Sequence, residues 1–332
     1  MKRALVIVLL LSLFIVAGSK EASAHQSWAV IDADTGRLLG GSNENVRLPI
    51  ASLTKIWTAL TVLESGVPLD TLTISPAAAS AEGSSTYLPQ GHVADVEGVL
   101  YGLMLRSGND AAQALAEHVG GTMEGFVRLM NEQAQLHGLN DTVFTNPSGL
   151  HNELHLSTAY ETALMLHFAL GNEKFRKISS TLNYSYDSNG QTYSWQNKHR
   201  LLHSKKTAIA GKTGFTKAAG RTLATYFEED GKNIIVVTLN NGDDWNTHLN
   251  IAAQVFSSYK LVTVAKKGMY DILPGVEGEL KSPIRLLLKK GEKANVSHII
   301  RIPRGKNELS TGRWTVLFNN EPMLTSKVQI VQ

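Results

Sequence analysis

The spacing of apolar and polar residues predicts a hairpin and then a helix at the start of the folded chain. Short apolar runs at residues 28–31 and 37–40 flank an Asp-Thr-Gly turn, which is typical of a β-hairpin. Over residues 53–63, apolar residues recur every three or four positions, and Gly66 stands where a glycine commonly ends a helix. We therefore expect a strand pair followed by an amphipathic helix that begins near Ser52.

Residues 69–203 have mainly helical spacing. Successive apolar stretches predict helices over residues 96–106, 111–119, 122–138 and 158–170. The last of these begins with Thr-x-x-Glu, a capping box in which each side chain can bond the backbone N–H of the other residue. We expect this part of the chain to be helical.

After Gly211 the apolar period changes from that of helices to that of strands. Residues 222–227 and 234–239, joined by an Asp-Gly turn, predict a second hairpin, and residues 247–259 predict a helix that packs back on it. A hairpin, then helices, then further strands favours an α/β fold. In this fold an antiparallel sheet is flanked by helices, and a helical subdomain is inserted between the two halves of the sheet.

Beyond residue 260 the chain has glycine turns and short runs of strand-forming residues. These runs lie at residues 284–288, 298–302, 314–318 and 328–331. We predict one domain over residues 25–260 and a small β-rich domain over residues 261–332, because roughly 300 mature residues exceed one typical core.

The first 24 residues have the form of a secretory signal peptide. Met1-Lys2-Arg3 precede an apolar run over residues 4–17, and Ala22-Ser23-Ala24 has the small-x-small form of a cleavage site. A membrane span needs about 20 apolar residues, more than this run supplies. We expect cleavage after Ala24 and an exported, secreted or wall-associated protein; an uncleaved N-terminal anchor is the alternative.

Charge and cysteine content exclude several classes of function. The chain has 32 Lys and Arg against 29 Asp and Glu, and three of the basic residues lie in the predicted signal peptide, so the mature protein is nearly neutral. A nucleic-acid partner would require a basic excess to neutralise phosphates, and we expect none. The absence of cysteine excludes disulfides, thiolate metal sites and a cysteine nucleophile.

Three short motifs follow one another along the chain: Ser52-Leu53-Thr54-Lys55, Ser107-Gly108-Asn109 and Lys212-Thr213-Gly214. Taken singly, they read as a helix start, an interhelix turn and a strand entry. Together, in this order and in these predicted elements, they match the set found in penicillin-binding proteins and class A β-lactamases. The joint occurrence favours a catalytic site.

The chemistry of these residue types supports a serine nucleophile. The Ser52 hydroxyl needs an adjacent base, and Lys55 lies one turn further along the same helix face. Burial and a second cation, for which Lys212 is the obvious candidate, would lower the pKa of Lys55 so that its neutral amine accepts the proton. Ser107 can pass a proton to the leaving amine, and the backbone N–H groups of Ser52 and Phe215 would form an oxyanion hole.

The remaining motif residues suit substrate binding. Asn109 can bond an amide of the substrate, while Lys212 and Thr213 offer donors to a carboxylate. Gly214 lets an edge strand lie close to a peptide-like ligand.

At this point the chain resembles a known family, the low-molecular-mass penicillin-binding proteins that act as serine-type D-alanyl-D-alanine carboxypeptidases. The resemblance covers most of residues 27–260 and is carried by "ASLTKIWTAL", "YGLMLRSGNDAAQALAEHVGG", "FTNPSGLH", "LSTAYETALM" and "GKTGFTKAAGRTL". The β-rich tail is similar to the usual second domain of the family.

The resemblance implies a penicillin-binding fold in which Ser52 forms an acyl-enzyme with a peptidoglycan stem peptide ending in D-Ala-D-Ala. The terminal D-alanine leaves, water then hydrolyses the ester, and β-lactam antibiotics act as covalent inhibitors by acylating the same serine. A basic residue shortly before Lys-Thr-Gly helps to hold the terminal carboxylate; it aligns with Lys198, and Arg200 is the alternative. No cofactor or metal is implied.

Two departures from the motif set and the family refine this prediction. The middle motif has Gly108 where the β-lactamase version has aspartate, and Ser-Gly-Asn is the form usual in the carboxypeptidases. Family members commonly end in an amphipathic helix on the membrane, whereas residues 324–332 read as a strand. This difference argues against peripheral membrane contact through the tail.

Other functions stay open on the sequence alone. A β-lactamase would need a glutamate for fast deacylation, and neither Glu153 nor Glu161 lies in a lactamase-like loop. A D,D-endopeptidase would use the same residues, and a non-enzymatic sensor would keep the fold without turnover.

The His-Asn-Glu-Leu-His stretch at residues 151–155 reads as a polar loop and not as a metal site, and Asp243 and Asp244 read as helix caps.

Overall fold

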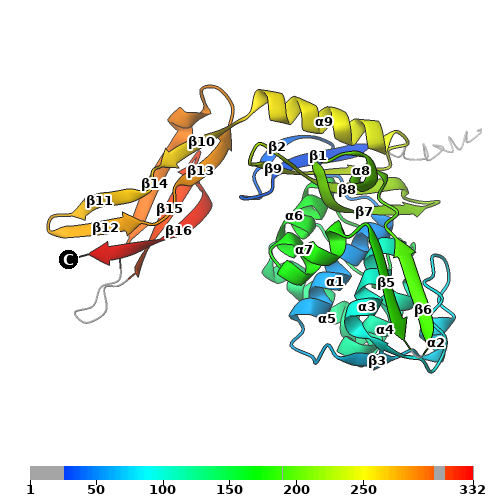
Figure 1. Ribbon diagram of the computed structural model, residues 1–332. Coiled ribbons are helices and arrows are strands. Elements are labelled where there is room, and N and C mark those ends of the chain that lie inside the picture. Colours follow the sequence, from blue (N-terminus) through cyan, green and yellow to red (C-terminus); the bar gives the residue numbers. More distant parts are fainter. Residues whose placement is uncertain (1–25, 189, 303–310, 332) are drawn as a thin grey trace, which may run out of the picture.

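The computed structural model describes residues 26–188, 190–302 and 311–331, so the predicted signal peptide lies outside the described residues. Its central feature is a five-stranded antiparallel sheet in the order β2-β1-β9-β8-β7 (Figure 1). The strands are β1 (Ser27–Asp32), β2 (Leu38–Ser42), β7 (Ala208–Thr216), β8 (Gly220–Glu229) and β9 (Lys232–Leu239). The two ends of this part of the chain therefore meet in one sheet, with β7 at an edge.

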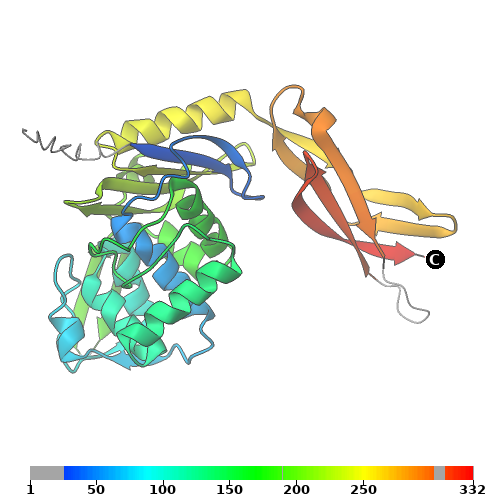
Figure 2. The same ribbon diagram turned by 180° about the vertical axis from the view of Figure 1, so that it is seen from behind.

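Helices cover both faces of this sheet. Helix α9 (Asp244–Ser258) crosses one face, and α6 (Ala159–Leu170) packs on the other, as both views show (Figures 1 and 2). The other helices inserted between β2 and β7 are α1 (Thr54–Glu64), α2 (Pro76–Ala79), α3 (Val96–Tyr101), α4 (Asn109–Gly120), α5 (Met123–Leu136), α7 (Glu173–Ser180) and α8 (Arg200–Ser204). This is the predicted arrangement of a flanked sheet with a helical insertion.

Strand alternation divides the interior of this domain into two cores. In β9, Ile235 and Val237 face the inserted helices, whereas Ile234 and Val236 face α9. Successive side chains of a strand point to opposite faces, so a continuous apolar run is required when both faces are covered. The predicted packing of the last helix on the sheet is confirmed.

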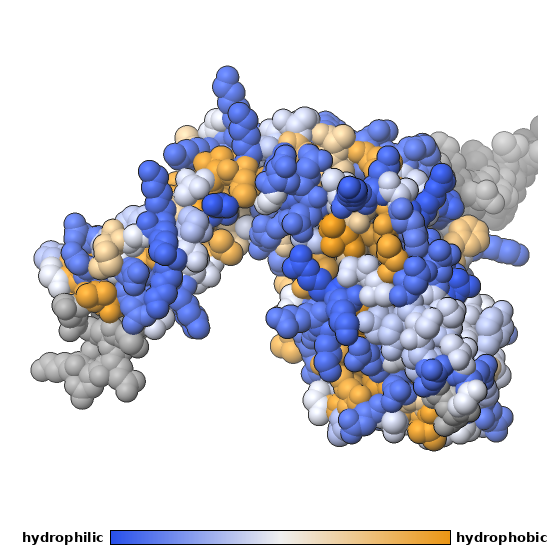
Figure 3. Space-filling view, in the orientation of Figure 1, coloured by the Kyte–Doolittle hydropathy of each residue, from blue (hydrophilic) through white to orange (hydrophobic). Residues whose placement is uncertain are grey.

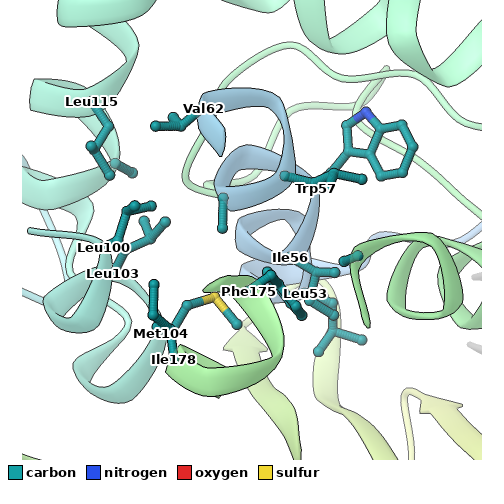
Figure 4. Close-up of a cluster of buried hydrophobic side chains, with 14 of the residues drawn as sticks. Leu53, Ile56, Trp57, Val62, Leu100, Leu103, Met104, Leu115, Phe175 and Ile178 are labelled. Atoms are coloured by element: carbon teal, nitrogen blue, oxygen red, sulfur yellow. The ribbon is translucent and has the colours of Figure 1, made fainter. Parts of the chain in front are cut away.

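Helix α1 lies at the centre of the larger core. Leu53, Ile56, Trp57 and Val62 are fully buried, and side chains from α3, α4 and α7 surround them (Figure 4). The Trp57 indole N–H also donates to the Met130 carbonyl over 2.9 Å. Burying each of these large side chains stabilises the fold by about 1.5–3 kcal/mol, so α1 is a rigid support.

Four short strands lie within the stretch that we predict to be helical. Strand β3 (Thr71–Thr73) pairs with β4 (Val93–Asp95), and β5 (Asn183–Ser188) pairs with β6 (Gln191–Gln196). The β5–β6 hairpin forms because its aromatic residues alternate with polar ones and stack on one face. These residues are Tyr184, Tyr186, Tyr193 and Trp195.

The C-terminal region forms two further sheets around a core of its own. One pairs β10 (Lys260–Ala265) with β13 (Ile284–Leu288), and the other has the order β11-β12-β16-β15-β14. The remaining strands are β11 (Gly268–Leu273), β12 (Val276–Leu280), β14 (Val296–Arg301), β15 (Thr311–Phe318) and β16 (Glu321–Val331). Trp314, Val316 and Val328 are among the buried residues of this separate core. The domain boundary near residue 260 remains our proposal, and α9 passes into β10 there.

The surface of the described chain is mixed in character. Figure 3 shows apolar side chains in separate patches among hydrophilic ones on the face in view. Within the described residues, no helix combines the length and the apolar character needed to cross a bilayer.

Arg37 connects the first hairpin to the C-terminal region. Its guanidinium donates to the Leu287 carbonyl, lies 3.3 Å from the Glu292 carboxylate and stacks 4.4 Å from the ring centroid of Phe318. Its side chain is only 11% exposed, so these interactions are poorly screened by water. Arg37 therefore holds the two regions in one orientation.

We predict that Arg37→Met loosens this junction. Loss of a charge-assisted hydrogen bond and of ring stacking costs about 1–3 kcal/mol, so amides of β13 should exchange roughly tenfold faster or more. Hydrogen–deuterium exchange with mass spectrometry measures this rate. The control is Arg285→Met, an exposed arginine of the same strand; equal exchange in both variants would contradict the role of Arg37.

Candidate active site

The three motifs lie on three separate elements that meet at the edge of the sheet. Ser52 is in the 3₁₀ turn η1 (Ala51–Leu53) that leads into α1, and Ser107 follows the π-helical turn η2 (Gly102–Arg106). Ala51 and Ser107 both have left-handed backbone, with φ of 49° and 64°. Such conformations cost about 1–3 kcal/mol each and cluster at functional sites.

An open cleft of about 330 Å³ lies between these elements. Its lining contains six residues that we predict as site residues or as part of their motifs: Ser52, Ser107, Lys198, Thr213, Gly214 and Phe215. The other lining residues are Ser84, Arg221, Thr222, Asp244 and Trp245. The volume is sufficient for a small peptide or drug-sized ligand.

Lys55 is fully buried beneath Ser52. Its Nζ lies 3.1 Å from Ser52 Oγ, 2.7 Å from Asn109 Oδ1 and 2.6 Å from the Ser148 carbonyl. The last two partners are oxygens that only accept, so they take two N–H bonds of the amine. A neutral amine then has its lone pair left for the Ser52 hydroxyl proton, which is the geometry that a general base requires.

The charge state of Lys55 favours the same role. Burial, and then the positive charge of Lys198, lower its pKa to about 7, while Asp110 opposes the shift. We predict Lys212 as the second cation; the cation that lowers the pKa of Lys55 in the structure is Lys198. Lys212 is itself 2% exposed, and burial and then the charge of Lys55 lower its pKa, so the two lysines disfavour each other's protonation.

Lys212 and Ser107 form a second buried pair. Lys212 Nζ lies 2.9 Å from Ser107 Oγ and 2.8 Å from the Thr213 carbonyl, and Lys212 does not line the cleft. The lysine of the third motif therefore faces the proton-transfer groups and not the cleft.

Asn109 supports Lys55 from the start of α4. Its Oδ1 accepts from Lys55, and its Nδ2 donates to the Glu82 carbonyl. It lines a neighbouring cavity that it shares with Ser148 and Leu150, and not the main cleft. A bond from Asn109 to a substrate amide must use the second hydrogen of Nδ2 or the second lone pair of Oδ1.

Gly214 allows the strand to approach the nucleophile. A Cβ at this position would lie 2.9 Å from the Ser52 backbone nitrogen. Because β7 is an edge strand, its outer side is free to receive a peptide in the manner of an added strand. Phe215 follows Gly214 at the cleft wall with its ring largely exposed, and the oxyanion hole between the Ser52 and Phe215 amides stays a prediction.

The two basic residues before the third motif differ in position. Lys198 lines the cleft, with Nζ 3.4 Å from Ser84 Oγ, and its pKa is lowered by burial and by Arg106. Arg200 is exposed at the start of α8 and is not among the cleft residues. The geometry supports Lys198 over Arg200.

The cleft also contains residues that sequence reasoning missed. Asp244 is predicted to cap α9, and its carboxylate does accept from the Trp245 N–H in the first turn of that helix over 2.8 Å. The same carboxylate also binds the Arg221 guanidinium, with bonds of 3.1 Å from Nε and 2.8 Å from Nη2. Asp243 occupies the N-cap position without a side-chain cap bond. In the sequence, this ion pair is indicated only by an arginine shortly after the third motif. Its two residues lie on separate elements, β8 and α9, so no local pattern links them.

His155 has a structural role. Its Nδ1 accepts from the Thr145 N–H over 3.1 Å, so its Nε2 carries the proton and donates to Thr54 Oγ1 over 2.7 Å. Thr54 Oγ1 in turn donates to the Ala51 carbonyl, next to the nucleophile. Both ring nitrogens are occupied, and the described residues contain no group of three or more side chains that would hold a metal.

Comparison with known proteins gives one consistent result. The family model described as D-alanyl-D-alanine carboxypeptidase, Peptidase S11, matches residues 15–243. A D-alanyl-D-alanine carboxypeptidase of Bacillus subtilis (DacF) is 32% identical over 297 residues, which cover 83% of this chain and 76% of the relative.

Solved structures agree with this match. A D-alanyl-D-alanine carboxypeptidase from Mycobacterium tuberculosis has a TM-score of 0.66 and 29% identity, covering 70% of this chain and 90% of its own. The carboxypeptidase DacD from Francisella tularensis, at 24% identity, shares the fold over 92% of both chains with a TM-score of 0.70.

We predict that His155 makes the fold sensitive to acid. Burial, and then the charge of Lys55, lowers its pKa to about 4. The unfolded chain, with a histidine pKa of about 6.5, therefore binds the proton more strongly, and the free energy of unfolding falls by up to about 3 kcal/mol as pH drops from about 6.5 to about 4.

Urea unfolding at a series of pH values tests this prediction. In His155→Gln the slope of stability against pH should become smaller, although stability at pH 7 also falls because a hydrogen bond is lost. The control is His151→Gln, on the exposed side of the same loop. An unchanged slope in His155→Gln would show that this ring does not carry the effect.

Proposed function

This chain belongs to the D-alanyl-D-alanine carboxypeptidase family, and on this premise we propose that Ser52 is the nucleophile of its serine-type hydrolysis, with Lys55 as base and Ser107 as proton donor. The observation that carries the proposal is the buried Lys55 amine, 3.1 Å from Ser52 Oγ with two acceptors fixing its N–H bonds. The cleft above Ser52 receives the substrate, a peptide ending in D-Ala-D-Ala.

The first half of the reaction forms an ester. Ser52 Oγ bonds to the carbonyl carbon of the penultimate D-alanine as its proton moves to Lys55 Nζ, and the oxyanion is held by the Ser52 and Phe215 amides. As the C–N bond breaks, the Ser107 hydroxyl gives its proton to the departing amine, and the proton held by Lys55 replaces it. The products are the acyl-enzyme and free D-alanine, with no net change of charge.

The second half returns the enzyme to its starting state. Water bonds to the ester carbonyl, loses a proton to the same lysine–serine cluster, and Ser52 leaves with that proton restored. β-Lactams mimic the D-Ala-D-Ala end and enter at the first step, so they acylate Ser52. Because the substrate lies in the cell wall, the enzyme acts outside the cytoplasm, in agreement with the predicted signal peptide.

The endopeptidase alternative uses the same residues. It differs only in the group that leaves, which is a cross-linked stem peptide in place of D-alanine. No observation in the cleft favours it over the carboxypeptidase, and analysis of the products from cross-linked muropeptides separates the two.

We predict that Ser52→Ala abolishes both D-alanine release and covalent labelling by penicillin. Without a hydroxyl no ester forms, so kcat should fall by at least about 10³-fold. Intact-mass analysis after exposure to penicillin, with peptide mapping, measures the adduct. Ser80→Ala, an exposed serine outside the cleft, should label as the unmodified protein does; an adduct on the Ser52→Ala protein would exclude Ser52 as nucleophile.

We also predict that acylation depends on the charge state of Lys55. Only the neutral amine accepts a proton, and its pKa is lowered by burial to about 7, so the acylation rate constant should rise about tenfold per pH unit below pH 7 and level off above it. Stopped-flow labelling with a fluorescent penicillin between pH 5 and pH 9 measures this profile.

A variant of Lys198 identifies the group that titrates. Lys198→Gln removes a positive charge that lowers the pKa of Lys55, so the inflection of the profile should move to higher pH. An unshifted profile in Lys198→Gln, or a flat profile in the unmodified enzyme, would contradict the assignment of Lys55 as base.

A further inference from the structure

Arg221 stands in the cleft beside the third motif with a fixed guanidinium. Strand β8 pairs with β7 so that Arg221 is opposite Phe215, and Thr222 is opposite Gly214. Directly opposed residues of antiparallel strands have Cα atoms about 4.5–5.5 Å apart. Arg221 is therefore the residue of β8 next to the predicted oxyanion hole.

Two neighbours hold the side chain of Arg221. The Asp244 carboxylate, which is almost completely buried, accepts from Nε and Nη2, and the ring of Trp245 lies 5.5 Å from the guanidinium carbon. Trp245 itself packs edge-on against the buried ring of His199, with centroids 5.4 Å apart. The backbone is tied as well, because the Asn241 N–H donates to the Arg221 carbonyl over 3.0 Å.

The contacts with Asp244 and Trp245 leave some N–H donors of Arg221 facing the cleft. A guanidinium has five N–H bonds, and Asp244 takes one from Nε and one from Nη2. The arginine side chain is still 42% exposed, whereas the aspartate is 2% exposed. The edge formed by Nη1 and the second hydrogen of Nη2 remains for a planar, two-oxygen acceptor, which is the geometry of a carboxylate.

We propose that Arg221, positioned by Asp244 and Trp245, is a specificity residue that binds the free C-terminal carboxylate of the peptide. The proposal rests on Ser52 being the nucleophile, since that fixes where the scissile carbonyl lies. The carboxylate is only one residue beyond that carbonyl, a distance of about 3.5 Å along an extended chain, and so stays within reach of an arginine opposite Phe215.

The other cations of the site are less suited to this role. Lys212 is turned inward to Ser107 and does not line the cleft. Lys198 lines the cleft but is a flexible point charge, which attracts an anion without fixing its orientation. Because Asp244 offsets the formal charge of Arg221, the contribution of Arg221 is directional hydrogen bonding, and Lys198 supplies the net attraction.

The test compares a free carboxylate with a masked one. Rates of D-alanine release from an acyl-L-Lys-D-Ala-D-Ala tripeptide are compared with release of D-alaninamide from its C-terminal carboxamide. A second pair, benzylpenicillin and its methyl ester, gives acylation rate constants where the carboxamide is too slow to measure. The unmodified enzyme should prefer the carboxylate form of each pair by 10-fold or more.

Arg221→Gln should reduce this preference by about 10-fold or more, mainly through slower reaction of the carboxylate form. Arg221→Lys should restore little of it, because an ammonium lacks the planar fork. Asp244→Asn, which frees the guanidinium without removing it, should raise KM for the carboxylate peptide and give an intermediate preference. Rescue of the preference by Arg221→Lys would overturn the geometric part of the proposal.

Arg176 provides a matched control. It has a similar environment away from the cleft, 3.8 Å from the Glu228 carboxylate and 5.6 Å from the ring centroid of Tyr226. Arg176→Gln should leave the preference unchanged. If Arg221→Gln slows both members of each pair equally, or if only Lys198→Gln lowers the preference, Arg221 does not bind the carboxylate. Absence of any acylation in the unmodified enzyme would instead remove the proposed function.

Discussion

The structure of the site depends on the burial of one lysine amine. Lys55 is 0% exposed, and an isolated ammonium at such a position would cost far more than a folded domain can offset. A neutral amine with two fixed acceptors removes this cost, but it requires that Asn109 and the Ser148 carbonyl both reach the first turn of α1. The helical insertion between β2 and β7 supplies both acceptors, so the base exists only in the complete fold.

Strained backbone conformations cluster around Ser52 and Lys55. Ala51 and Ser107 adopt left-handed conformations, and Gly149, at φ 80°, packs so closely that a Cβ there would clash with the Ala51 carbonyl. These strained backbone conformations are kept because the surrounding core packs against them. The turn at Ser52 is held on one side by the buried face of α1 and on the other by the Thr54–His155 hydrogen bond. The packed domain therefore keeps this turn in its strained backbone conformation.

Local patterns predicted the parts of this site that lie on single elements. Ser52 and Lys55 share one helix face, and Lys212, Thr213 and Gly214 share one strand, so spacing alone placed them. Arg221 and Asp244 come from β8 and α9, and no local period links them. The β5–β6 hairpin was missed for a related reason: its aromatic face is stabilised by packing on neighbouring helices, which overrides the helical trend of the residues around it.

The cations of the cleft connect binding to chemistry. The charge of Lys198 helps to keep the pKa of Lys55 near 7, so about half of the free enzyme holds a neutral, weakly basic amine at pH 7. On the proposed function, a substrate carboxylate that arrives at Lys198 and Arg221 offsets that charge, and the repulsion that Lys55 feels decreases. The amine then becomes a stronger base just when Ser52 must lose its proton. A base that is partly neutral before binding and stronger after it requires a nearby positive charge that the substrate can offset. Lys198 provides that charge, while Arg221, already paired with Asp244, orients the carboxylate.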